Sequence, residues 1–308
     1  MSECNHNCSE CTQNCSSRQC DHNCDDCELE CESRNECTHD CSSCSANCSS
    51  RQYNREDFLI KTNQYSNVKK VIGIVSGKGG VGKSLVTSSL AVAMNQLGYN
   101  VGILDADITG PSIPQAFGLT GSLYATEDAI IPAETVNGIK VVSTNLILEN
   151  ATDPVVWRGP IIAGMVKQFY SDVNWGDIDY MFVDLPPGTG DVPLTVFQSL
   201  PLDGIIVVTT PQQLVGMIVE KAINMAGMMQ IPVIGVIENM SYIKCDQCGH
   251  EVPIFGKKNT EAMSDKLQLN LLAKLPLDPY LASAVDEGLI ENYPVEGLDK
   301  AIEAIKSL

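Results

Sequence analysis

The sequence predicts an α/β fold in which a mostly parallel sheet carries helices on both faces, preceded by a Cys-rich segment without a hydrophobic core. Apolar runs of strand length alternate with helical patterns over residues 71–308. The first of these runs leads into a Gly-rich turn and then a helix. By contrast, the only large aliphatic residue between Asn5 and Gln52 is Leu29. We therefore predict three parts, namely Cys-rich repeats over 1–51, a linker or lead-in helix over 52–70, and an α/β domain over 71–308.

The strand candidates are short continuous apolar runs, which are typical of strands buried on both faces. They cover residues 71–75, 101–104, 180–183, 204–209 and 232–237. Helical patterns separate most of them, most clearly over residues 83–97 and 212–229. Strands that alternate with helices predict a parallel sheet, and ligands of such sheets bind beyond the carboxyl ends of the strands. The motifs described below all lie at those ends.

The N-terminal segment repeats one cysteine pattern three times. Each copy reads C-x-H-x-C-x2-C-x3-C, with a period of 16 or 17 residues. The cysteines are Cys4, Cys8, Cys11, Cys15, Cys20, Cys24, Cys27, Cys31, Cys37, Cys41, Cys44 and Cys48. A copy offers four thiolates and one histidine, a set that suits an iron–sulfur cluster, zinc or Cu(I). We expect iron–sulfur or zinc rather than a metal-free segment, with His6, His22 and His39 either ligands or solvated.

Composition limits the partners and the compartment. The formal net charge is −18, which disfavours nucleic acid and anionic membrane surfaces as partners. No apolar run is long enough for a membrane span, and residues 1–50 contain no apolar stretch typical of a signal peptide. We expect a cytoplasmic protein, in which clustered cysteines are more often metal ligands than disulfides.

A phosphate-binding loop follows the first predicted strand. Residues 76–84 read SGKGGVGKS, and the stretch from Gly77 matches G-x4-G-K-[ST]. Such a loop turns its backbone N–H groups toward an anion, and the next helix aims its positive end at the same place. The expected phosphate-binding residues are Gly77, Lys78, Gly79, Gly80, Val81, Gly82, Lys83 and Ser84. Lys83 should reach the β- and γ-phosphates of ATP, and the Ser84 hydroxyl should hold Mg²⁺.

Acidic residues end two further strands of the predicted sheet. Asp184 follows the run 180–183, where a carboxylate is well placed to coordinate Mg²⁺. Asp105 and Asp107 follow the run 101–104 in the same way. They either contribute to the same site or cap the following turn, and we favour the site.

Two cysteines outside the repeats form a C-x-x-C motif at Cys245 and Cys248. The motif suits a redox disulfide, half of a zinc site or half of a cluster site, with His250 as a possible third ligand. Two thiolates cannot close a tetrahedral metal site. Two copies of the chain related by symmetry would supply four, the usual number for a [4Fe–4S] cluster.

The motifs resemble those of a known group of ATPases. Residues 78–84, KGGVGKS, are similar to the deviant Walker A motif of the MinD/ParA/nitrogenase iron protein group. Further stretches resemble the Mrp/ApbC/Nbp-type iron–sulfur cluster carrier ATPases over about residues 71–308. They are DITGPSIP at 107–114, WRGP at 157–160, DLPPGTGD at 184–191, ENMS at 238–241 and IFG at 254–256. Leu85 departs from the pattern, since the family usually has Thr there, and the three repeats differ from the single cysteine set of eukaryotic relatives.

The resemblance implies roles for individual residues. Lys78 would cross the interface of a nucleotide-sandwich homodimer, Asp107 would orient the attacking water, and Asp105 would support the magnesium. Asn239 stands where the family places a base-reading asparagine, and the turn around Asp278 is a second candidate for that task. Cys245 and Cys248 would bind a labile [4Fe–4S] cluster that bridges two chains.

The expected function is therefore that of an ATP-dependent iron–sulfur cluster scaffold or carrier, with ATP, Mg²⁺ and a [4Fe–4S] cluster bound by a homodimer. Its partners would be apo iron–sulfur proteins. The alternative is a MinD/ParA-like positioning ATPase with an accessory metal-binding tail. That alternative needs a basic or membrane-binding surface. The apolar stripe of Leu298, Ile302, Ile305 and Leu308 has too few basic neighbours for a membrane face, so we expect it to pack on the core.

Overall fold

The computed structural model of the chain describes residues 55–107, 110, 112–147, 159–211, 217–245, 247–255, 269–293 and 296–308. The chain divides into two units, Met1–Asp57 and Phe58–Leu308. Only the second is described at length, after a short 3-10 helix at Arg55–Phe58. The three cysteine repeats lie outside the described residues, so the metal expected there stays a prediction.

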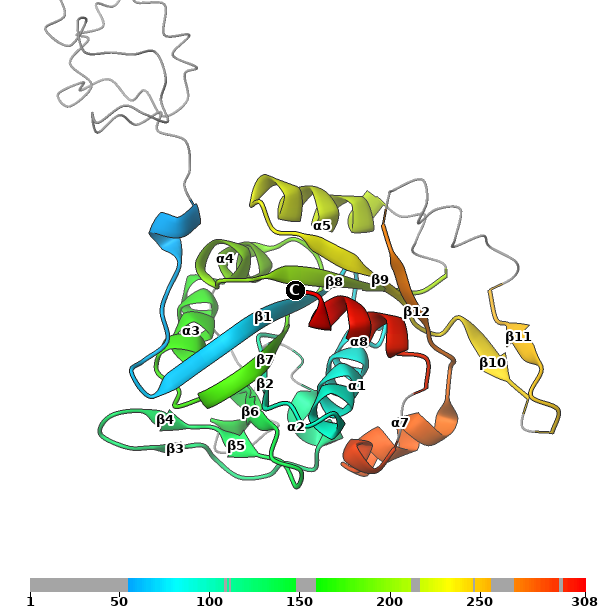
Figure 1. The fold of residues 1–308 in the computed structure, drawn as a ribbon, viewed down its shortest axis with the longest axis horizontal. Coiled ribbons are helices and arrows are strands. Elements are labelled where there is room, and N and C mark those ends of the chain that lie inside the picture. The colour runs from blue at the N-terminus through cyan, green and yellow to red at the C-terminus, as the bar shows by residue number, and fades with distance from the viewer. Residues whose placement is uncertain are drawn as a thin grey trace, which may run out of the picture. The chain divides into compact units, whose positions relative to one another are not determined.

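An eight-stranded sheet forms the centre of the second unit (Figure 1). Its strand order is β12-β9-β8-β1-β7-β2-β6-β5, and every neighbouring pair is parallel except β5 with β6. The strands are β1 (Ser66–Ser76), β2 (Val101–Asp105), β5 (Ala133–Glu134), β6 (Lys140–Val142), β7 (Gly176–Asp184), β8 (Gly204–Thr209), β9 (Val233–Glu238) and β12 (Leu271–Lys274). The predicted α/β class with a mostly parallel sheet is confirmed.

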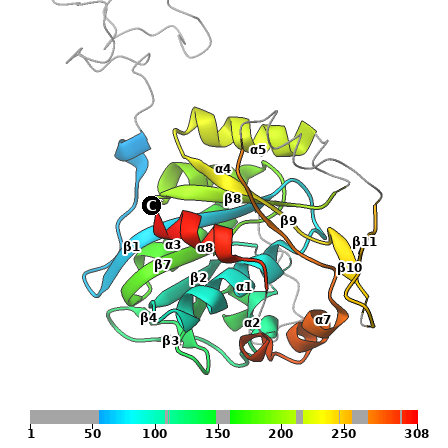
Figure 2. The same cartoon turned by 45° about the vertical axis from the view of Figure 1, so that its right-hand side comes forward.

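Helices cover both faces of this sheet (Figures 1 and 2). One face packs against α1 (Lys83–Gln96), α2 (Ile113–Ala116), α7 (Pro279–Asp286) and α8 (Asp299–Lys306). The other packs against α3 (Gly159–Ser171), α4 (Asp191–Ser199) and α5 (Met217–Met228). Each face therefore has its own apolar core, around Leu90 and Ile103 on one side and Trp175 and Phe197 on the other.

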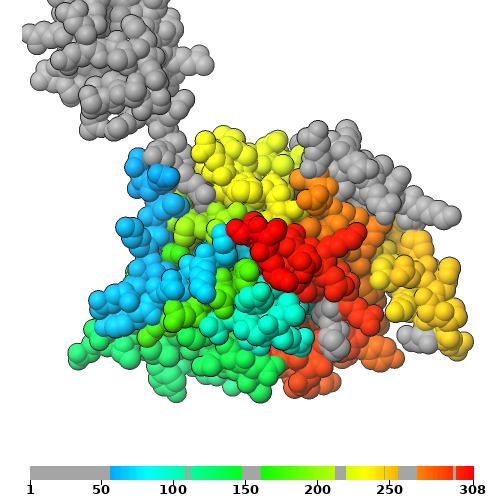
Figure 3. Space-filling model, viewed as in Figure 1, coloured from blue at the N-terminus to red at the C-terminus, as the bar shows by residue number. Residues whose placement is uncertain are grey.

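Smaller elements surround the sheet. Two hairpins stand apart from it, β3 (Tyr124–Ala125) with β4 (Ile130–Ile131), and β10 (Tyr242–Lys244) with β11 (Glu251–Pro253). Single 3-10 turns occur at Thr144–Leu146 and Ile290–Asn292. In Figure 3 the gold atoms of the β10–β11 hairpin lie at the margin of the face on which α1 and α8 are visible.

The first strand begins earlier than the sequence predicted. β1 starts at Ser66, so five residues that we assigned to the linker belong to the sheet. Burial alternates along 66–70 and becomes complete from Val71 onward. The first half is therefore polar on one face, and the continuous apolar run that marked the strand covers only its second half.

The last helix packs on the core, as the stripe of apolar residues predicted. Leu298 and Ile305 are almost completely buried, and Ile302 packs against the same cluster. Figure 3 shows α8, in red, beside α1, in cyan. Among the described residues, no helix is both long and apolar enough to cross a membrane.

The carboxyl ends of the parallel strands bring the predicted motifs to one edge of the sheet. Since β1 lies between β8 and β7, and β2 pairs with β7, the strand ends follow one another as Thr209, Ser76, Asp184 and Asp105. Asp105 and Asp184 are direct partners in the register of β2 and β7. Residues far apart in the sequence thereby meet at one site.

Candidate functional site

The loop between β1 and α1 has the backbone of an anion cradle. Gly80 and Gly82 adopt left-handed φ values of 78° and 77°, which a side chain would strain. α1 begins at Lys83 with Gly82 as its N-cap, and no side chain caps it. Helix N-termini leave backbone N–H groups without intrahelical acceptors, and phosphate oxygens satisfy such groups well. The loop and the helix therefore form a ready phosphate site.

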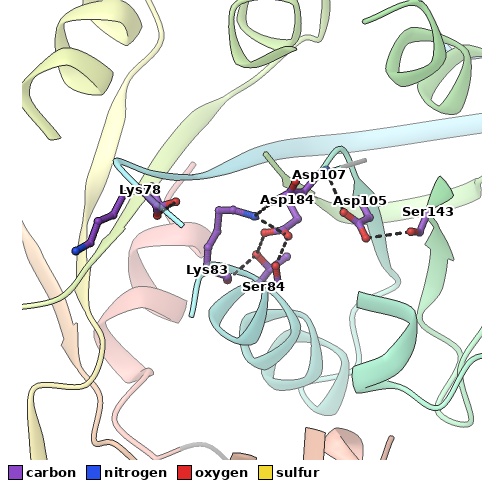
Figure 4. A network of polar contacts seen from close by, with 9 residues as sticks. Lys78, Lys83, Ser84, Asp105, Asp107, Ser143 and Asp184 are labelled. Carbon is purple, nitrogen blue, oxygen red and sulfur yellow. Dashed lines mark hydrogen bonds and ion pairs between the residues drawn. The ribbon is translucent and has the colours of Figure 1, made fainter. Parts of the chain in front are cut away.

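A cluster of buried polar groups lies beneath this cradle (Figure 4). Lys83 Nζ is 2.7 Å from Asp184 Oδ2, and the Ser84 hydroxyl donates to the same oxygen at 2.6 Å. The Thr87 hydroxyl lies 2.7 Å from the other oxygen, Asp184 Oδ1. Asp184 is completely buried, and Lys83 is only 6% exposed. One carboxylate thus holds the lysine and two hydroxyls of the phosphate-binding helix in fixed positions.

Asp105 extends the cluster on the adjacent strand. It is completely buried, accepts a hydrogen bond from the Ser143 hydroxyl at 3.0 Å, and accepts another from the Asp107 N–H at 3.1 Å. Burial, and secondarily the charge of Asp184, raises the pKa of the Asp105 carboxyl well above its usual value. Asp107 Oδ2 is 3.8 Å from Lys83 Nζ. The structure therefore brings together Lys83, Asp105, Asp107 and Asp184, four of the charged residues that the sequence singled out.

The donor set of this cluster fits Mg²⁺. The groups next to Lys83 are hard oxygen donors, namely the Ser84 hydroxyl and the carboxylates of Asp184 and Asp105. Two carboxylates and one lysine are buried here, and the charge of Asp184 contributes to the raised pKa of Asp105. A divalent cation bound with phosphate would favour the ionised form of both carboxylates.

Two flanking features surround the loop. Lys78 is exposed, and its side chain points away from the Lys83–Asp184 cluster (Figure 4). On the other side, the segment after β7 turns at Gly188, whose φ is 87° and whose N–H donates to Ser76 O at 2.9 Å. This second loop is therefore tied to the start of the phosphate loop.

The two candidates for base recognition have other contacts in this structure. The Asn239 amide donates through Nδ2 to Val81 O at 3.0 Å, and its Oδ1 accepts from the Met240 N–H at 2.9 Å. Asp278 caps α7 by accepting from the N–H groups of Tyr280 and Leu281. It also accepts from the Tyr293 hydroxyl at 2.6 Å, a hydrogen bond that raises the pKa of Tyr293 to about 12. A base-reading role for either residue stays a prediction.

The second cysteine pair occupies the tip of the β10–β11 hairpin. Cys245 N donates to His250 O at 2.9 Å, and Gly249 N donates to Cys245 O at 2.8 Å, with Gly249 at a left-handed φ of 69°. Cys245 is half-buried, Cys248 is exposed, and neither is in a disulfide. Over the described residues, no group of three or more Cys, His, Asp or Glu side chains could hold a metal, so His250 does not complete a site within one chain.

Sequence reasoning missed two residues of the nucleotide site. Thr87 lies one helical turn after Lys83, on the face that meets Asp184, and this spacing was the available signal. Ser143 directly follows β6, which pairs with β2, and its hydroxyl donates to Asp105. The sequence signal for it was weak, namely a polar residue at the end of a short apolar strand. Leu85, in contrast, packs against the apolar cluster on the α1 face, consistent with its apolar side chain.

Comparison with known proteins gives a family match along most of the chain. The family model described as ParA, NUBPL iron-transfer P-loop NTPase matches residues 67–307. An iron–sulfur cluster carrier protein of Clostridium perfringens is 45% identical over 240 residues, which cover 75% of this chain and 84% of the relative. One from Methanocaldococcus jannaschii is 45% identical over 257 residues, covering 82% of this chain and 87% of the relative.

Solved structures agree on the fold. A nucleotide-binding protein from Archaeoglobus fulgidus in complex with ADP is 42% identical, with a TM-score of 0.67, over 73% of this chain and 89% of that one. The septum site-determining protein MinD of Pyrococcus horikoshii, complexed with Mg-ADP, is 24% identical. Its TM-score is 0.51, over 78% of this chain and 95% of that one, a likeness of fold alone.

Proposed function

Because the chain belongs to the ParA/NUBPL family of iron-transfer P-loop NTPases, we propose that it is an ATP-dependent iron–sulfur cluster carrier. In this proposal it binds a [4Fe–4S] cluster between two copies of the chain and transfers the cluster to apo-proteins. The cluster is the cargo, and ATP is the substrate that the chain hydrolyses.

The buried cluster beneath the phosphate loop supports the ATPase part of the proposal. The N-terminus of α1 and the Lys83 ammonium would bind the phosphates and stabilise the charge that develops on them as water attacks the γ-phosphorus. Asp107, 3.8 Å from Lys83 Nζ, borders the place where the γ-phosphate would lie, and would orient that water. Lys78, exposed and pointing outward, would reach the nucleotide of a second chain.

Mg²⁺ would be held by Ser84 and Asp184 with support from Asp105, and when bound it supplies positive charge to the β- and γ-phosphate oxygens. Asp184 also accepts from Ser84 and is in contact with Lys83 and Thr87. These contacts hold Ser84, Thr87 and Lys83 beside the loop, and Lys83 would turn from Asp184 toward the phosphates when nucleotide binds.

The single observation that carries the cargo assignment is the thiol pair at the hairpin tip. Cys245 and Cys248 lie on a turn fixed by two backbone hydrogen bonds, with Cys248 exposed and Cys245 half-buried. The described residues add no third ligand to the pair. Two hairpins from two chains would give the four thiolates that a [4Fe–4S] cluster takes. The hairpin thus accounts for both the cargo and the homodimer.

The N-terminal repeats would add iron–sulfur or zinc sites to this carrier, in line with four thiolates in each copy. The positioning ATPase remains the alternative, but α8 lends it no support, because the apolar stripe of that helix is packed in the core. The solved septum site-determining protein MinD shares the fold of this chain at only 24% identity.

Anaerobic reconstitution with iron and sulfide tests the proposal. We expect the chain lacking residues 1–51 to bind about four iron atoms per dimer, the content of one [4Fe–4S] cluster, and to donate them to an apo-ferredoxin-type acceptor. Cys245→Ala/Cys248→Ala in the same shortened chain should bind none, while remaining folded by circular dichroism.

The matched control keeps both cysteines and changes another residue of the same hairpin turn, because His250→Ala should leave the iron content unchanged. Iron that stays bound to the double cysteine variant, or a shortened wild-type chain that binds no iron at all, would refute the carrier assignment. A size-exclusion profile that stays monomeric with cluster bound would refute the bridging geometry.

A further inference from the structure

One side chain connects the phosphate loop with the segment that carries the thiol pair. Asn239 is 1% exposed and donates through Nδ2 to the carbonyl of Val81, in the middle of the loop. A Cβ atom built on Gly82 would lie 2.2 Å from the same Nδ2 atom. The amide therefore packs directly against the loop backbone, and the loop cannot shift toward it without displacing it.

The other end of the Asn239 side chain holds the next residue in an unusual conformation. Its Oδ1 accepts from the Met240 N–H at 2.9 Å. Met240 has a left-handed φ of 55°, one of two such values among the described residues other than glycine. A single residue of this kind costs on the order of 1 kcal/mol and persists only where its surroundings enforce it. The turn is thus held under strain by a residue that also touches the phosphate loop.

A short rigid path leads from this turn to the thiols. Ser241 donates through its hydroxyl to Glu238 Oε1 at 2.6 Å and through its N–H to Leu275 O at 2.9 Å. β10 begins at the next residue, Tyr242, whose carbonyl accepts from Leu277 N at 2.8 Å. Cys245 follows the three residues of β10 directly. A rotation at Met240 that carries the bonded segment 275–277 with it would therefore move the hairpin tip as a unit, because the strand between them is paired and extended.

We propose that Asn239 is a positioning residue that transmits the nucleotide state of the phosphate loop to the Cys245–Cys248 hairpin through the strained Met240 turn. When phosphate binding reorients the Val81 carbonyl, the amide loses or changes its acceptor, and Met240 loses the acceptor that holds its φ. The hairpin tip then changes its exposure. This proposal rests on the proposed function, because the coupling has a role only if the thiols carry a cluster. The contacts that would transmit it do not involve iron.

Thiol alkylation tests this coupling in the full chain without any cluster. The reduced apo-protein is treated with iodoacetamide, with and without a saturating non-hydrolysable ATP analogue, and the rates at Cys245 and Cys248 are read by peptide mass mapping. In wild type the analogue should change the rate at one or both thiols by about fivefold or more, the lower end of ordinary coupling free energies. In Asn239→Ala the ratio should approach one at an analogue concentration that saturates that variant.

Two further variants separate coupling from loss of structure. Met240→Gly relieves the left-handed strain and keeps the Asn239 hydrogen bond to Val81, although it removes the Met240 side chain that lies beside Gly82. It should lower the ratio at an analogue concentration that saturates the variant. Asn63→Ala is the matched control, because Asn63 makes the same kind of amide contact, Nδ2 to Val173 O at 2.8 Å, near the opposite end of β1. It should keep the wild-type ratio. If Asn239→Ala does not fold, Met240→Gly decides.

The outcomes distinguish this proposal from base recognition by Asn239 and from the absence of any coupling. An Asn239→Ala chain with weaker ATP binding, lost preference over GTP and an unchanged alkylation ratio at saturation would make Asn239 a base-reading residue and overturn the coupling. A wild-type ratio of one would overturn it as well. Failure of the shortened chain to bind iron would refute the carrier function, yet it would leave the alkylation ratio readable.

Discussion

The nucleotide site and the cysteine hairpin differ in how completely one chain builds them. Asp105 and Asp184 are fully buried, and contacts from two strands, a helix and the β6 end fix them. The thiol pair lies at the end of a hairpin whose strands have three residues each, with Cys245 half-buried and Cys248 exposed. The first site is preorganised for a substrate, whereas the second offers two thiols, which under the proposed function would be half of a metal site completed by another chain.

The two regions also differ in the desolvation cost of their side chains. Buried charges strain the nucleotide-free protein, because their desolvation is only partly offset by Lys83 and the hydroxyls around them. The cysteine pair of the hairpin is not fully buried, since Cys248 is exposed and Cys245 is half-buried, so this cost is smaller there. Substitutions in the two regions should therefore change different quantities, chemistry and stability in the first and metal content in the second.

The largest effect is expected from Lys83→Ala. Loss of the ammonium beside the phosphates should lower the rate of ATP hydrolysis by about 10²- to 10³-fold, the usual result of removing one preorganised charge or donor. Phosphate release from the purified protein measures it. Lys69→Ala is the control, because Lys69 is an exposed lysine paired with Asp179 on β7, and it should hydrolyse ATP at the wild-type rate. Full activity in Lys83→Ala would show that the loop is not the phosphate site.

A smaller loss should follow Thr87→Val, which keeps the shape but removes the hydroxyl 2.7 Å from Asp184. A hydrogen bond to a charged group contributes about 1.5–3 kcal/mol, so hydrolysis should fall by roughly 10-fold. Ser89→Ala is the matched control on the same helix, since the Ser89 hydroxyl bonds only a helix carbonyl, Leu85 O, at 2.7 Å. Equal losses of activity in both variants would mean that helix stability, and not the contact with Asp184, is responsible.

Asp105→Asn tests the cost of buried charge. The raised pKa of Asp105 means that the folded chain holds this proton more tightly than the unfolded chain. Its contribution to stability therefore falls as pH rises above the ordinary pKa of an aspartate. The asparagine variant escapes that loss and should gain on the order of 1 kcal/mol in the nucleotide-free state, with a larger gain at pH 8 than at pH 5. Thermal unfolding at both pH values measures it, and a variant less stable than wild type at pH 8 would contradict the prediction.

The smallest effect should come from Cys248→Ser in the metal-free protein. The thiol is exposed, so the free energy of unfolding should change by less than about 0.5 kcal/mol. Urea unfolding under reducing conditions provides the measurement. A loss of several kcal/mol would show that the hairpin is as firmly built into one chain as the nucleotide site, and the contrast between the two regions would disappear.

Much of the nucleotide site was predictable because its motif is local. The run from Gly77 to Ser84 is contiguous, and the spacing of its glycines, lysine and hydroxyl is enough to predict what each would do in binding phosphate. Asp105, Asp107 and Asp184 were predictable in kind, because acidic residues after apolar strands meet at one edge of a parallel sheet. The start of β1 at Ser66 was not, since its first half exposes alternate residues and lacks the apolar run.

The sequence by itself determined the fold class, the phosphate loop, the acidic residues at the strand ends and the presence of a second cysteine pair. Only the tertiary structure decided that Asp184 joins Lys83, Ser84 and Thr87, that Ser143 supports Asp105, and that Asn239 touches the loop at Val81. The reason is physical. Local motifs act through backbone conformation that neighbouring residues encode, whereas these contacts join residues up to 158 positions apart, which only the strand order brings together.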